Sequence, residues 1–468
     1  MRHQGRLGAI EEMMKPPKHI QYREKILTGS IIRTMFWFAW PIFLSNLVNI
    51  SYNLVDALWL GRLGREAFGA PTVSWPMIML IYSIGFGYLT AGISLTSQYY
   101  GAGDFENAEK SASQQFFFSL IVAVFFSIGG FLVAPHILAY MGVPSDIYPL
   151  ATSYTRTIFI GIPFVFTGFV YITIANSLGD TRTPTVLNII SSVVNIILDP
   201  LFIFGYFGFP KMGVNGAAVA TILSRTIVSV VGVYYLFKGI LGIRIRVRYM
   251  WFRGWWLRKI IKIGTPLAIQ QSSNSLGFAI MMSIVSKFGS VVVAAYGVAI
   301  RIVDVLQAFT GAVQRSVAIM IGQNIGAEKY NRAKKIAATA LISVFVFLLV
   351  GSIIIYLFRD VLIAVFINDP AVIVEGAKVL GIFTWSIPFF GVFFIAGAIA
   401  MGSGHTKIFA IISITRLWLL RIGLSILLAV LLDMGSIGIY IAMAISNIVA
   451  GVSSFIWIMS ESWVKKVI

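Results

Sequence analysis

The chain has 468 residues, of which 58% are hydrophobic and 12% are charged, and its formal net charge is +18. A soluble protein carries about a quarter charged residues and cannot bury so much apolar surface, so a water-soluble enzyme or nucleic-acid-binding domain is excluded. The excess of Lys and Arg instead predicts basic loops that face an anionic membrane surface, with the lipid bilayer and not nucleic acid as partner.

Apolar runs long enough to cross a bilayer, at about 20 residues per crossing, follow one another along the chain. They fall at 34–60, 71–99, 113–140, 150–178, 184–207, 214–237, 263–286, 293–322, 337–358, 379–401, 408–432 and 436–460. We therefore expect an all-α integral membrane protein with twelve transmembrane helices. Prolines inside the runs, such as Pro41 and Pro163, are tolerated because neighbouring helices satisfy the freed backbone groups.

The distribution of Lys and Arg predicts the orientation. With the N-terminus placed in the cytoplasm, 24 basic residues fall on cytoplasmic segments and six on the opposite side. Cytoplasmic loops of membrane proteins carry such an excess. We expect a multi-pass protein of the cell membrane, monomeric, with both termini in the cytoplasm.

An internal repeat relates the two halves of the chain at an offset of 225 residues, without a gap from Pro41 to Arg182. The run Gln98, Gly101, Ala102, Ala108, Lys110, for example, matches Gln323, Gly326, Ala327, Ala333, Lys335. Each repeat holds six spans, an even number, so both halves enter the membrane from the same side. This parallel repeat predicts two pseudo-symmetric six-helix lobes around a central cleft, with alternating access by rocking of the lobes.

The repeat also sets the expected domain boundaries: an N-terminal tail over 1–30, an N-lobe over 31–237, a linker over 238–259 and a C-lobe over 260–468. The linker alternates isoleucine and valine with arginine over 243–248 and then carries three tryptophans. This pattern is typical of a stretch in the headgroup layer, with Trp toward the apolar side and Arg toward phosphate. Regulation by anionic lipid is the functional alternative.

Three acidic residues lie within predicted spans: Asp56, Asp199 and Asp304. A carboxylate at membrane depth costs a few kcal/mol, so each is a functional candidate. Two of them end polar stripes, one formed by Ser45, Asn49, Tyr52, Asn53 and Asp56, the other by Asn188, Ser191, Ser192, Asn195 and Asp199. Spacings of three and four residues place each stripe on one helix face.

Across the repeat, Asp56 aligns with Met281 and Asp199 with Leu424, so these acids belong to the N-lobe alone. We expect spans one and five to face each other and to form a cation site from Asp56 and Asp199, with neutral oxygens from Asn195, Asn176 and Thr221. Carboxylates with neutral oxygens suit Na⁺, for which Asp56, Asp199 and Asn195 are the first ligand candidates.

The same pair could instead bind a proton, because two carboxylates in a dry site cannot both stay ionised at little cost. The structural alternative is that each acid pairs with an arginine or caps a helix break before Pro200. Asp304 is expected to pair with Arg301, three residues before it, and a role in lobe movement or substrate contact is the alternative. Further candidates form the substrate cleft or its hinge: Pro41, Asn49, Tyr52, Asn53 and Asn188. On the C-lobe side, Gln270, Gln271, Gln314 and Arg315 could line the cleft or join helices by hydrogen bonds.

The chain resembles the multidrug and toxic compound extrusion (MATE) family of antiporters over essentially its whole membrane region. The features that carry the resemblance are PIFLSNLVNISYNLVDALWLGRLG in span one, the pair SQYYGAGDFENA and GQNIGAEKYNRA, the LGDTRTP turn, and NIILDP in span five.

The resemblance implies a transporter, not an enzyme, that exports organic cations in exchange for Na⁺ or H⁺ and needs no other cofactor. It places the coupling site at Asp56, Asn176, Asn195, Asp199 and Thr221 and implies bending of span one near Pro41. A flippase for lipid-linked sugars, from the same superfamily, is the alternative. Its cleft would be cationic, and six arginines lie within the spans: Arg156, Arg225, Arg301, Arg315, Arg416 and Arg421.

Overall fold

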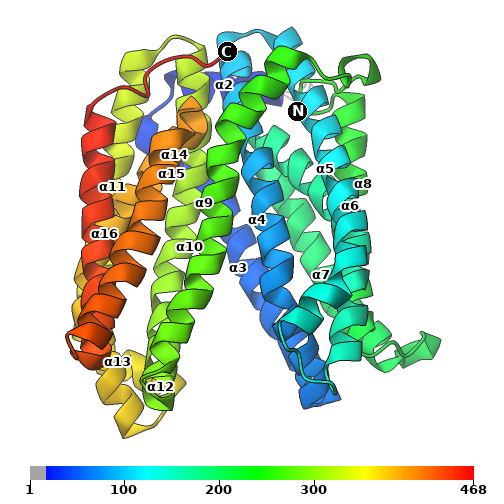
Figure 1. The fold of residues 1–468 in the computed structure, drawn as a ribbon. Coiled ribbons are helices and arrows are strands. Elements are labelled where there is room, and N and C mark those ends of the chain that lie inside the picture. Colours follow the sequence, from blue (N-terminus) through cyan, green and yellow to red (C-terminus); the bar gives the residue numbers. More distant parts are fainter. Residues whose placement is uncertain (1–16) are drawn as a thin grey trace, which may run out of the picture.

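The computed structural model describes residues 17–468, in which every regular element is a helix (Figure 1). Residues 1–16 of the expected tail lie outside the described residues. A short helix, α2 (Lys18–Thr28), precedes the first lobe. The N-lobe comprises α3 (Ile31–Leu63), α4 (Arg65–Ala102), α5 (Phe105–Tyr140), α6 (Tyr148–Ser177), α7 (Arg182–Phe204) and α8 (Val214–Lys238).

The C-lobe has the same six-span plan with more irregular helices. Its elements are α9 (Gly254–Ser286), α10 (Ser290–Gly326), α11 (Tyr330–Leu357), α12 (Arg359–Phe366), α13 (Pro370–Phe383), α14 (Ile387–Ser403), α15 (Thr406–Ile414), the π-helical η4 (Thr415–Gly423) and η5 (Ile426–Leu431), and α16 (Gly435–Met459). The tenth span consists of α13 and α14 joined by the 3-10 turn Thr384–Ser386. The eleventh starts as α-helix and continues as π-helix, which is rare and concentrates at functional sites.

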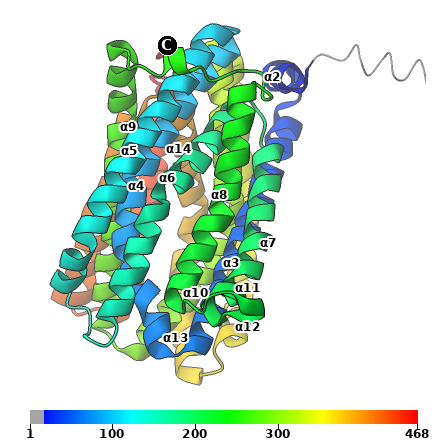
Figure 2. The same ribbon diagram turned by 90° about the vertical axis from the view of Figure 1, so that its right-hand side faces the viewer.

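The predicted twelve-span, two-lobe architecture is confirmed. Among the described residues, eleven spans are long and apolar enough to cross a membrane by length and composition. The twelfth is α9, which has 33 residues and packs along α4. Its hydropathy is lowered by a polar run over 270–275. Figure 2 shows the spanning helices running side by side. Many large hydrophobic side chains on them are exposed, such as Phe125 and Leu419, and offer apolar surface to lipid.

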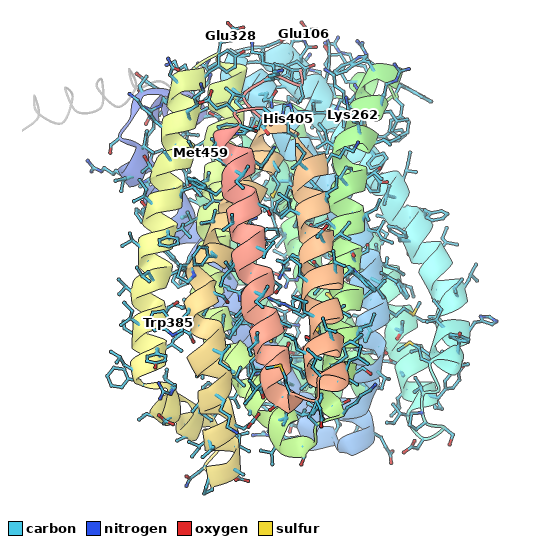
Figure 3. All side chains as sticks on the ribbon, turned by 60° about the vertical axis from the view of Figure 1, so that its left-hand side comes forward. Glu106, Lys262, Glu328, Trp385, His405 and Met459 are labelled. Carbon is cyan, nitrogen blue, oxygen red and sulfur yellow. The ribbon has the colours of Figure 1, made fainter. Side chains whose placement is uncertain are left out.

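The lobes meet through two pairs of helices related by the repeat: α4 packs on α9, and α3 packs on α10. We call the end that holds α2 and Ile468 the α2 end. In Figure 1 the two lobes lie close together there and diverge toward the opposite end, where α12 and α13 lie. Charged side chains such as Glu106, Lys262 and Glu328 gather at the α2 end (Figure 3).

Glycines allow the close approach of α4 and α10 at the α2 end. A Cβ added to Gly101 would lie 2.1 Å from the carbonyl oxygen of Gln323, and one added to Gly326 would lie 1.9 Å from that of Gln98. The two contacts are equivalent under the repeat. Any larger residue would therefore force the lobes apart at this end.

Two segments outside the spans, α2 and the stretch near Val467, also form hydrogen bonds where the lobes meet at the α2 end. On α2, the Arg23 guanidinium donates to the carbonyl oxygens of Tyr100 (2.9 Å) and Gly101 (2.7 Å) in the N-lobe. In the C-lobe, Asn324 donates from its side chain to the carbonyl of Ile26 on α2, at 3.3 Å. Near the other terminus, the backbone N–H of Val467 donates to Gln98 Oε1 at 3.0 Å. Part of the segment expected as a tail is thus a helix that bridges the lobes.

The segment between the lobes is shorter than the expected linker, because α9 begins at Gly254. Ile243 and Ile245 are buried, and Arg246 forms an ion pair with Glu109 of α5 at 3.2 Å. Trp256 lies inside α9, fully buried, and its indole N–H donates to Ser111 Oγ at 3.2 Å. Packing of this ring on the N-lobe explains why the helix starts within the aromatic part of the segment.

Candidate functional site

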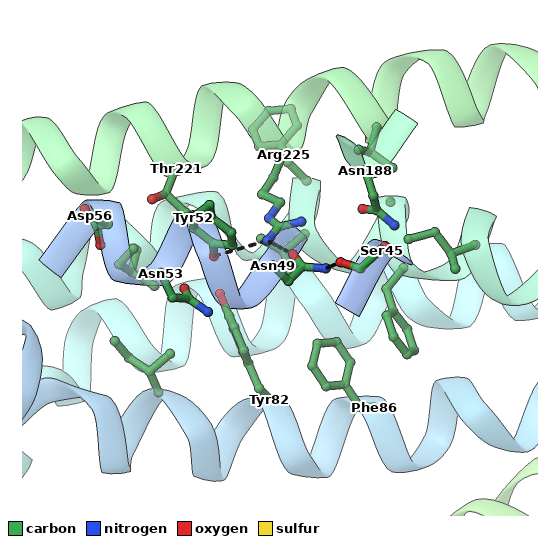
Figure 4. A pocket seen from close by; sticks show the side chains of 18 of the residues that line it. Ser45, Asn49, Tyr52, Asn53, Asp56, Tyr82, Phe86, Asn188, Thr221 and Arg225 are labelled. Atoms are coloured by element: carbon green, nitrogen blue, oxygen red, sulfur yellow. Dashed lines mark hydrogen bonds between the residues drawn. The ribbon is translucent and has the colours of Figure 1, made fainter. Parts of the chain in front are cut away.

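A cavity of about 360 Å³ lies between α3, α4, α6, α7 and α8 of the N-lobe, with Arg315 of α10 at its C-lobe side. The polar stripe expected on span one faces it: Ser45, Asn49, Tyr52, Asn53 and Asp56 all line the wall (Figure 4). Asn188 of α7 and Thr221 of α8 line it as well. Aromatic residues of α4 and α6, such as Tyr82 and Tyr154, supply the remaining surface.

One arginine organises the polar face of α3. The Arg225 guanidinium, on α8, donates to Asn49 Oδ1 and to the Tyr52 hydroxyl, each at 3.1 Å (Figure 4). Its carbon Cζ also lies 5.2 Å from the centre of the Tyr52 ring. Asn49 in turn donates to the carbonyl of Ser45 at 2.8 Å. No pattern in the sequence indicates that this arginine is a structural partner of the stripe.

Asp199 lies behind the cavity wall on α7, which packs against α3. The residue has 0% of its surface exposed, and its Oδ1 accepts a hydrogen bond from Asn195 Nδ2 at 3.2 Å. Asp56, at the end of the α3 stripe, is partly buried. The two carboxylates repel each other, and both negative charges act on Tyr154 of α6, which lines the cavity. The two acids therefore belong to one electrostatic group.

The acid pair leaves several buried oxygens without a hydrogen-bond partner. They are Asp56 Oδ1, Asp199 Oδ2, Asn195 Oδ1 and Ser192 Oγ. Buried polar atoms are almost always satisfied, so a cluster of acceptors without partners is suited to hold a cation or a proton. Two carboxylates, an amide oxygen and a hydroxyl fit Na⁺. Carboxylates that repel each other also fit a shared proton.

The structural alternative for the two acids is not supported. Among the side chains that the structure describes, no Lys or Arg forms an ion pair with Asp56 or Asp199. The helix α7 runs from Arg182 to Phe204 through Pro200, so Asp199 caps no break. The same described residues hold no group of three or more His, Asp or Glu that could bind a metal by themselves. A cation here would depend on the neutral oxygens.

The structure does not bring Asn176 to the acid pair. Tyr154, near both acids, and Asn176 lie on the same helix, 22 residues apart, which is about 33 Å at 1.5 Å of rise per residue. Asn176 lines a different cavity at the lobe interface. Pro41 also lies away from the cavity of the stripe: it borders a pocket with Trp37 and Trp40, inside a helix α3 that is continuous. Thr221, a candidate cation ligand, lines the same cavity as Asp56, and so does the cleft candidate Asn188.

A second cavity, of about 430 Å³, adjoins the first and lies mainly in the C-lobe. Phe86, Phe169, Ile172 and Arg315 line both cavities. The residues proposed for the C-lobe side of the cleft all line it: Gln270, Gln271, Gln314 and Arg315. Arg416, on the π-helical η4, completes this wall. Gln270 also donates to Ser413 Oγ at 3.1 Å, so it joins helices and lines the cleft.

The expected pair of Arg301 with Asp304 is not formed. Both side chains are exposed, and within the described part of the chain Asp304 makes no ion pair. The Arg301 charge still acts on Asp304 from a greater distance. Neither residue lines the two cavities. Spacing of three residues permits contact on one helix face but does not require it.

Comparison with known proteins agrees with this arrangement. A family model described as MatE matches residues 41–201 and 266–427. The protein named "Probable multidrug resistance protein YoeA" from Bacillus subtilis is 29% identical over 437 residues, 92% of this chain and 94% of the relative. A protein named "FAD transporter" from Shewanella oneidensis is 27% identical over 436 residues, 92% of this chain and 95% of the relative.

Solved structures share the fold. The one titled "Crystal structure of MATE in the bent conformation" matches with a TM-score of 0.88 at 24% identity, over 96% of this chain and 98% of that chain. The family model starts at residues 41 and 266, which differ by 225, the offset of the internal repeat. The resemblance read from the sequence is therefore confirmed, and it extends over both repeats.

Proposed function

Because the chain belongs to the MatE family, we propose that it exports organic cations in exchange for Na⁺ or H⁺ by alternating access. The relatives' names support the coarser statement that the protein is a multi-span membrane transporter for drug-like molecules and not an enzyme. The coupling ion and the charge of the substrate are our inference. The observation that carries it is the cluster of unpartnered buried oxygens around Asp56 and Asp199.

The geometry supplies a reason for exchange. Asp56 lines the cavity, so a cationic substrate and a coupling ion would compete for the same negative charge. Asp199 lies fully buried behind Asp56, and the two negative charges repel each other. The pair is therefore more stable with one bound cation than with none. Binding of the ion removes the charge that retains the substrate. Two ligands that bind in turn and not together give antiport.

Access to the cavity would change with the lobe contact at the α2 end. We place both termini, and therefore the α2 end, in the cytoplasm, on the basis of the basic residues. The contacts of Gln98 and Gln323 across the lobes then close the cytoplasmic side. In this state the cleft would release substrate to the outside and admit the ion. The opposite state requires that these contacts break.

The test is efflux of a cationic dye from proteoliposomes under an imposed Na⁺ or pH gradient. We expect one of the two gradients to drive efflux, and we expect Asp56→Asn and Asp199→Asn to abolish the response. Asp304→Asn is the matched control, because it makes the same change in an intramembrane acid that lines neither cavity. Gradient-driven efflux at the wild-type rate in both test variants would reject the acid pair as the coupling site.

A flippase for lipid-linked sugars remains the second candidate, because three of the six intramembrane arginines do face the cavities: Arg225, Arg315 and Arg416. Arg225 is already bonded to Asn49 and Tyr52, which leaves two free. Translocation of a fluorescent lipid-linked sugar across vesicles, with no dye efflux, would favour this candidate.

A further inference from the structure

Arg416 is the most unusual charged residue of the C-lobe. Its side chain is 2% exposed, and its Nε and Nη1 atoms have no hydrogen-bond partner. It forms no ion pair in the described part of the chain, and its Cζ lies 4.9 and 5.1 Å from the ring centres of Phe390 and Phe393. Buried charges are normally paired, because an unpaired one is strongly destabilising. This guanidinium lines a cavity and is free to bind a ligand there.

The neighbouring arginine on the same π-helical segment provides the contrast. Arg421 Nε donates to Ser446 Oγ at 3.1 Å and its Nη2 donates to Asn447 Oδ1 at 2.6 Å. It does not line the second cavity. Arg421 is therefore accounted for by packing within the lobe, whereas Arg416 is not. The C-lobe thus provides hydrogen-bond acceptors for one buried arginine, Arg421, but not for the other.

A second arginine reaches the same cavity from another helix. Arg315 of α10 lines it, has its side chain exposed to the cleft, and makes no ion pair in residues 17–468. None of the described residues that line the cavity is Asp or Glu. Side-chain amides that can donate, such as Gln271 and Gln314, stand beside the two arginines. The wall is thus cationic, with no acid to neutralise it.

The rest of the cavity wall is aromatic. Phe86 and Phe169 come from the N-lobe, and Phe393, Phe394 and Phe409 from the C-lobe. Flat apolar groups pack well between such rings, and guanidinium groups bind carboxylate or phosphate through paired hydrogen bonds. An organic cation placed here would instead meet two positive charges.

We propose that the second cavity is a binding subsite for an organic anion, in which Arg416 and Arg315 hold a carboxylate or phosphate and the phenylalanines hold a flat apolar body. Substrates with an anionic group would then be admitted beside cations, which extends the proposed transport function. A zwitterion would also fit, with its positive group toward Asp56 in the first cavity and its negative group toward Arg315 and Arg416 in the second. Anion binding at this subsite does not depend on ion coupling. An experiment can therefore reject the anion subsite without rejecting ion-coupled export, and the reverse.

Two dyes with the same ring system and opposite charge test the subsite. Purified protein in detergent is titrated with carboxyfluorescein, an anion, and with rhodamine 6G, a cation, and binding is followed by fluorescence polarisation without any gradient. We expect saturable binding of carboxyfluorescein. Arg416→Gln and Arg315→Gln should each weaken it at least tenfold, and Arg416→Lys should weaken it less, because Lys keeps the charge but not the planar fork. Rhodamine 6G affinity should not fall in either Gln variant.

Arg301→Gln is the matched control: it removes an arginine from α10 that lines neither cavity, and it should leave carboxyfluorescein binding unchanged. Size-exclusion elution and thermal unfolding verify folding of each variant. If Arg416→Gln fails to fold, the effect of Arg315→Gln on carboxyfluorescein binding tests the proposal by itself. Carboxyfluorescein that does not bind saturably, or that binds equally well to both folded Gln variants, would overturn the proposal unless anionic lipid proves to be the ligand.

A lipid headgroup carries the same chemistry as a soluble anion, so a second arm separates the sources. The titration is repeated in nanodiscs of phosphatidylcholine with and without phosphatidylglycerol. Displacement of the dye by phosphatidylglycerol, lost in Arg416→Gln, identifies lipid phosphate as the occupant. Unchanged dye binding identifies a soluble organic anion. If neither the dye nor phosphatidylglycerol shows arginine-dependent binding, the cavity is not an anion site.

Discussion

Gln98 and Gln323 occupy equivalent positions in the two repeats, and each donates its side-chain amide to the opposite lobe. Gln98 Nε2 lies 3.1 Å from the carbonyl oxygens of Gly402 and Ser403, and Gln323 Nε2 lies 2.8 Å from that of Ser177. Ser177 and Gly402 are themselves 225 residues apart. The closure at the α2 end is therefore a symmetric pair of contacts.

A bulkier residue at the closure should change which side of the cavity is open. Gly326→Val places a side chain against the Gln98 carbonyl, and overpacking of this kind costs about 1–3 kcal/mol. The chain has no cysteine, so Asn53→Cys introduces a single labelling site in the cavity. We expect Gly326→Val to slow labelling by an external impermeant maleimide roughly tenfold, since 1.4 kcal/mol is a tenfold change in population.

Gly297→Val is the control for this experiment. Gly297 lies on the same helix, and nothing lies within 4 Å of a Cβ added there. Labelling should keep the wild-type rate in this variant. Equal labelling in Gly326→Val would contradict the view that the glycine contacts hold the closed state.

Neutralising Asp199 should stabilise the protein while it removes coupling. The carboxylate is fully buried, repels Asp56 and leaves Oδ2 without a partner. Asn at this position keeps an acceptor for Asn195 and removes an uncompensated charge. We expect the thermal unfolding midpoint of Asp199→Asn in detergent to rise, with no change for the exposed Asp304→Asn. A lower midpoint would show that the charge is compensated in a way not seen here.

The bond between Arg225 and Tyr52 should appear as a coupling energy. Tyr52→Phe removes one hydroxyl from a charged donor, a contact of about 1.5–3 kcal/mol when buried, and keeps the ring beneath the guanidinium. In a double-mutant cycle with Arg225→Met, measured by unfolding in SDS mixed micelles, we expect a coupling of about 1 kcal/mol or more. Tyr88, bonded to Thr265 at the lobe interface, offers the control, because Tyr88→Phe should show no coupling to Arg225.

Stability should fall in mildly acidic solution because of His405. This residue lies in the turn between α14 and α15, and burial lowers its pKa below 6.5, with Lys465 and Lys262 acting in the same direction. The unfolded chain then binds the proton more readily than the folded one. Neutral His405 therefore contributes fully to the free energy of unfolding above the pKa that it has in the unfolded chain. This contribution is lost as the pH falls below that pKa.

The measurement is the thermal unfolding midpoint of the wild-type protein and of His405→Gln between pH 7.5 and 5.5. The wild-type midpoint should drop more than that of the variant. Parallel curves for the two proteins would exclude His405 as the titrating group.

The spans and their pairing into lobes could be predicted because lipid imposes length and hydrophobicity on each helix separately, and because the repeat is visible in the residues themselves. The acid pair followed from the same logic: a polar stripe on one face of a helix in lipid must face protein. Spacings of three and four residues place Asp56 beside Asn53 and Tyr52 whatever the rest of the chain does.

Depth in the membrane was harder to predict. Asn176 carries a suitable side-chain oxygen, yet it lies at the opposite end of α6 from Tyr154, which is near Asp56. Periodicity gives the face of a helix but not its height relative to a neighbour, which depends on loop lengths and packing. The partner of Arg225 was hidden for the same reason. The start of α9 at Gly254 depends on burial of Trp256 against the N-lobe, a tertiary contact that a local pattern of Arg and Trp does not reveal.

The eleventh span carries Arg416 on a stretch of backbone that is not wound as an ordinary α-helix. Over Thr415–Gly423 the backbone is π-helical, with one residue more in each hydrogen-bonded ring than an α-helix has. Returning one such turn to α-winding would swing the side chains on it by about 100° around the axis, the angle between successive residues. A change in a few backbone hydrogen bonds could therefore rotate the Arg416 guanidinium about the helix axis, toward the cleft or away from it, without a sideways shift of the helix.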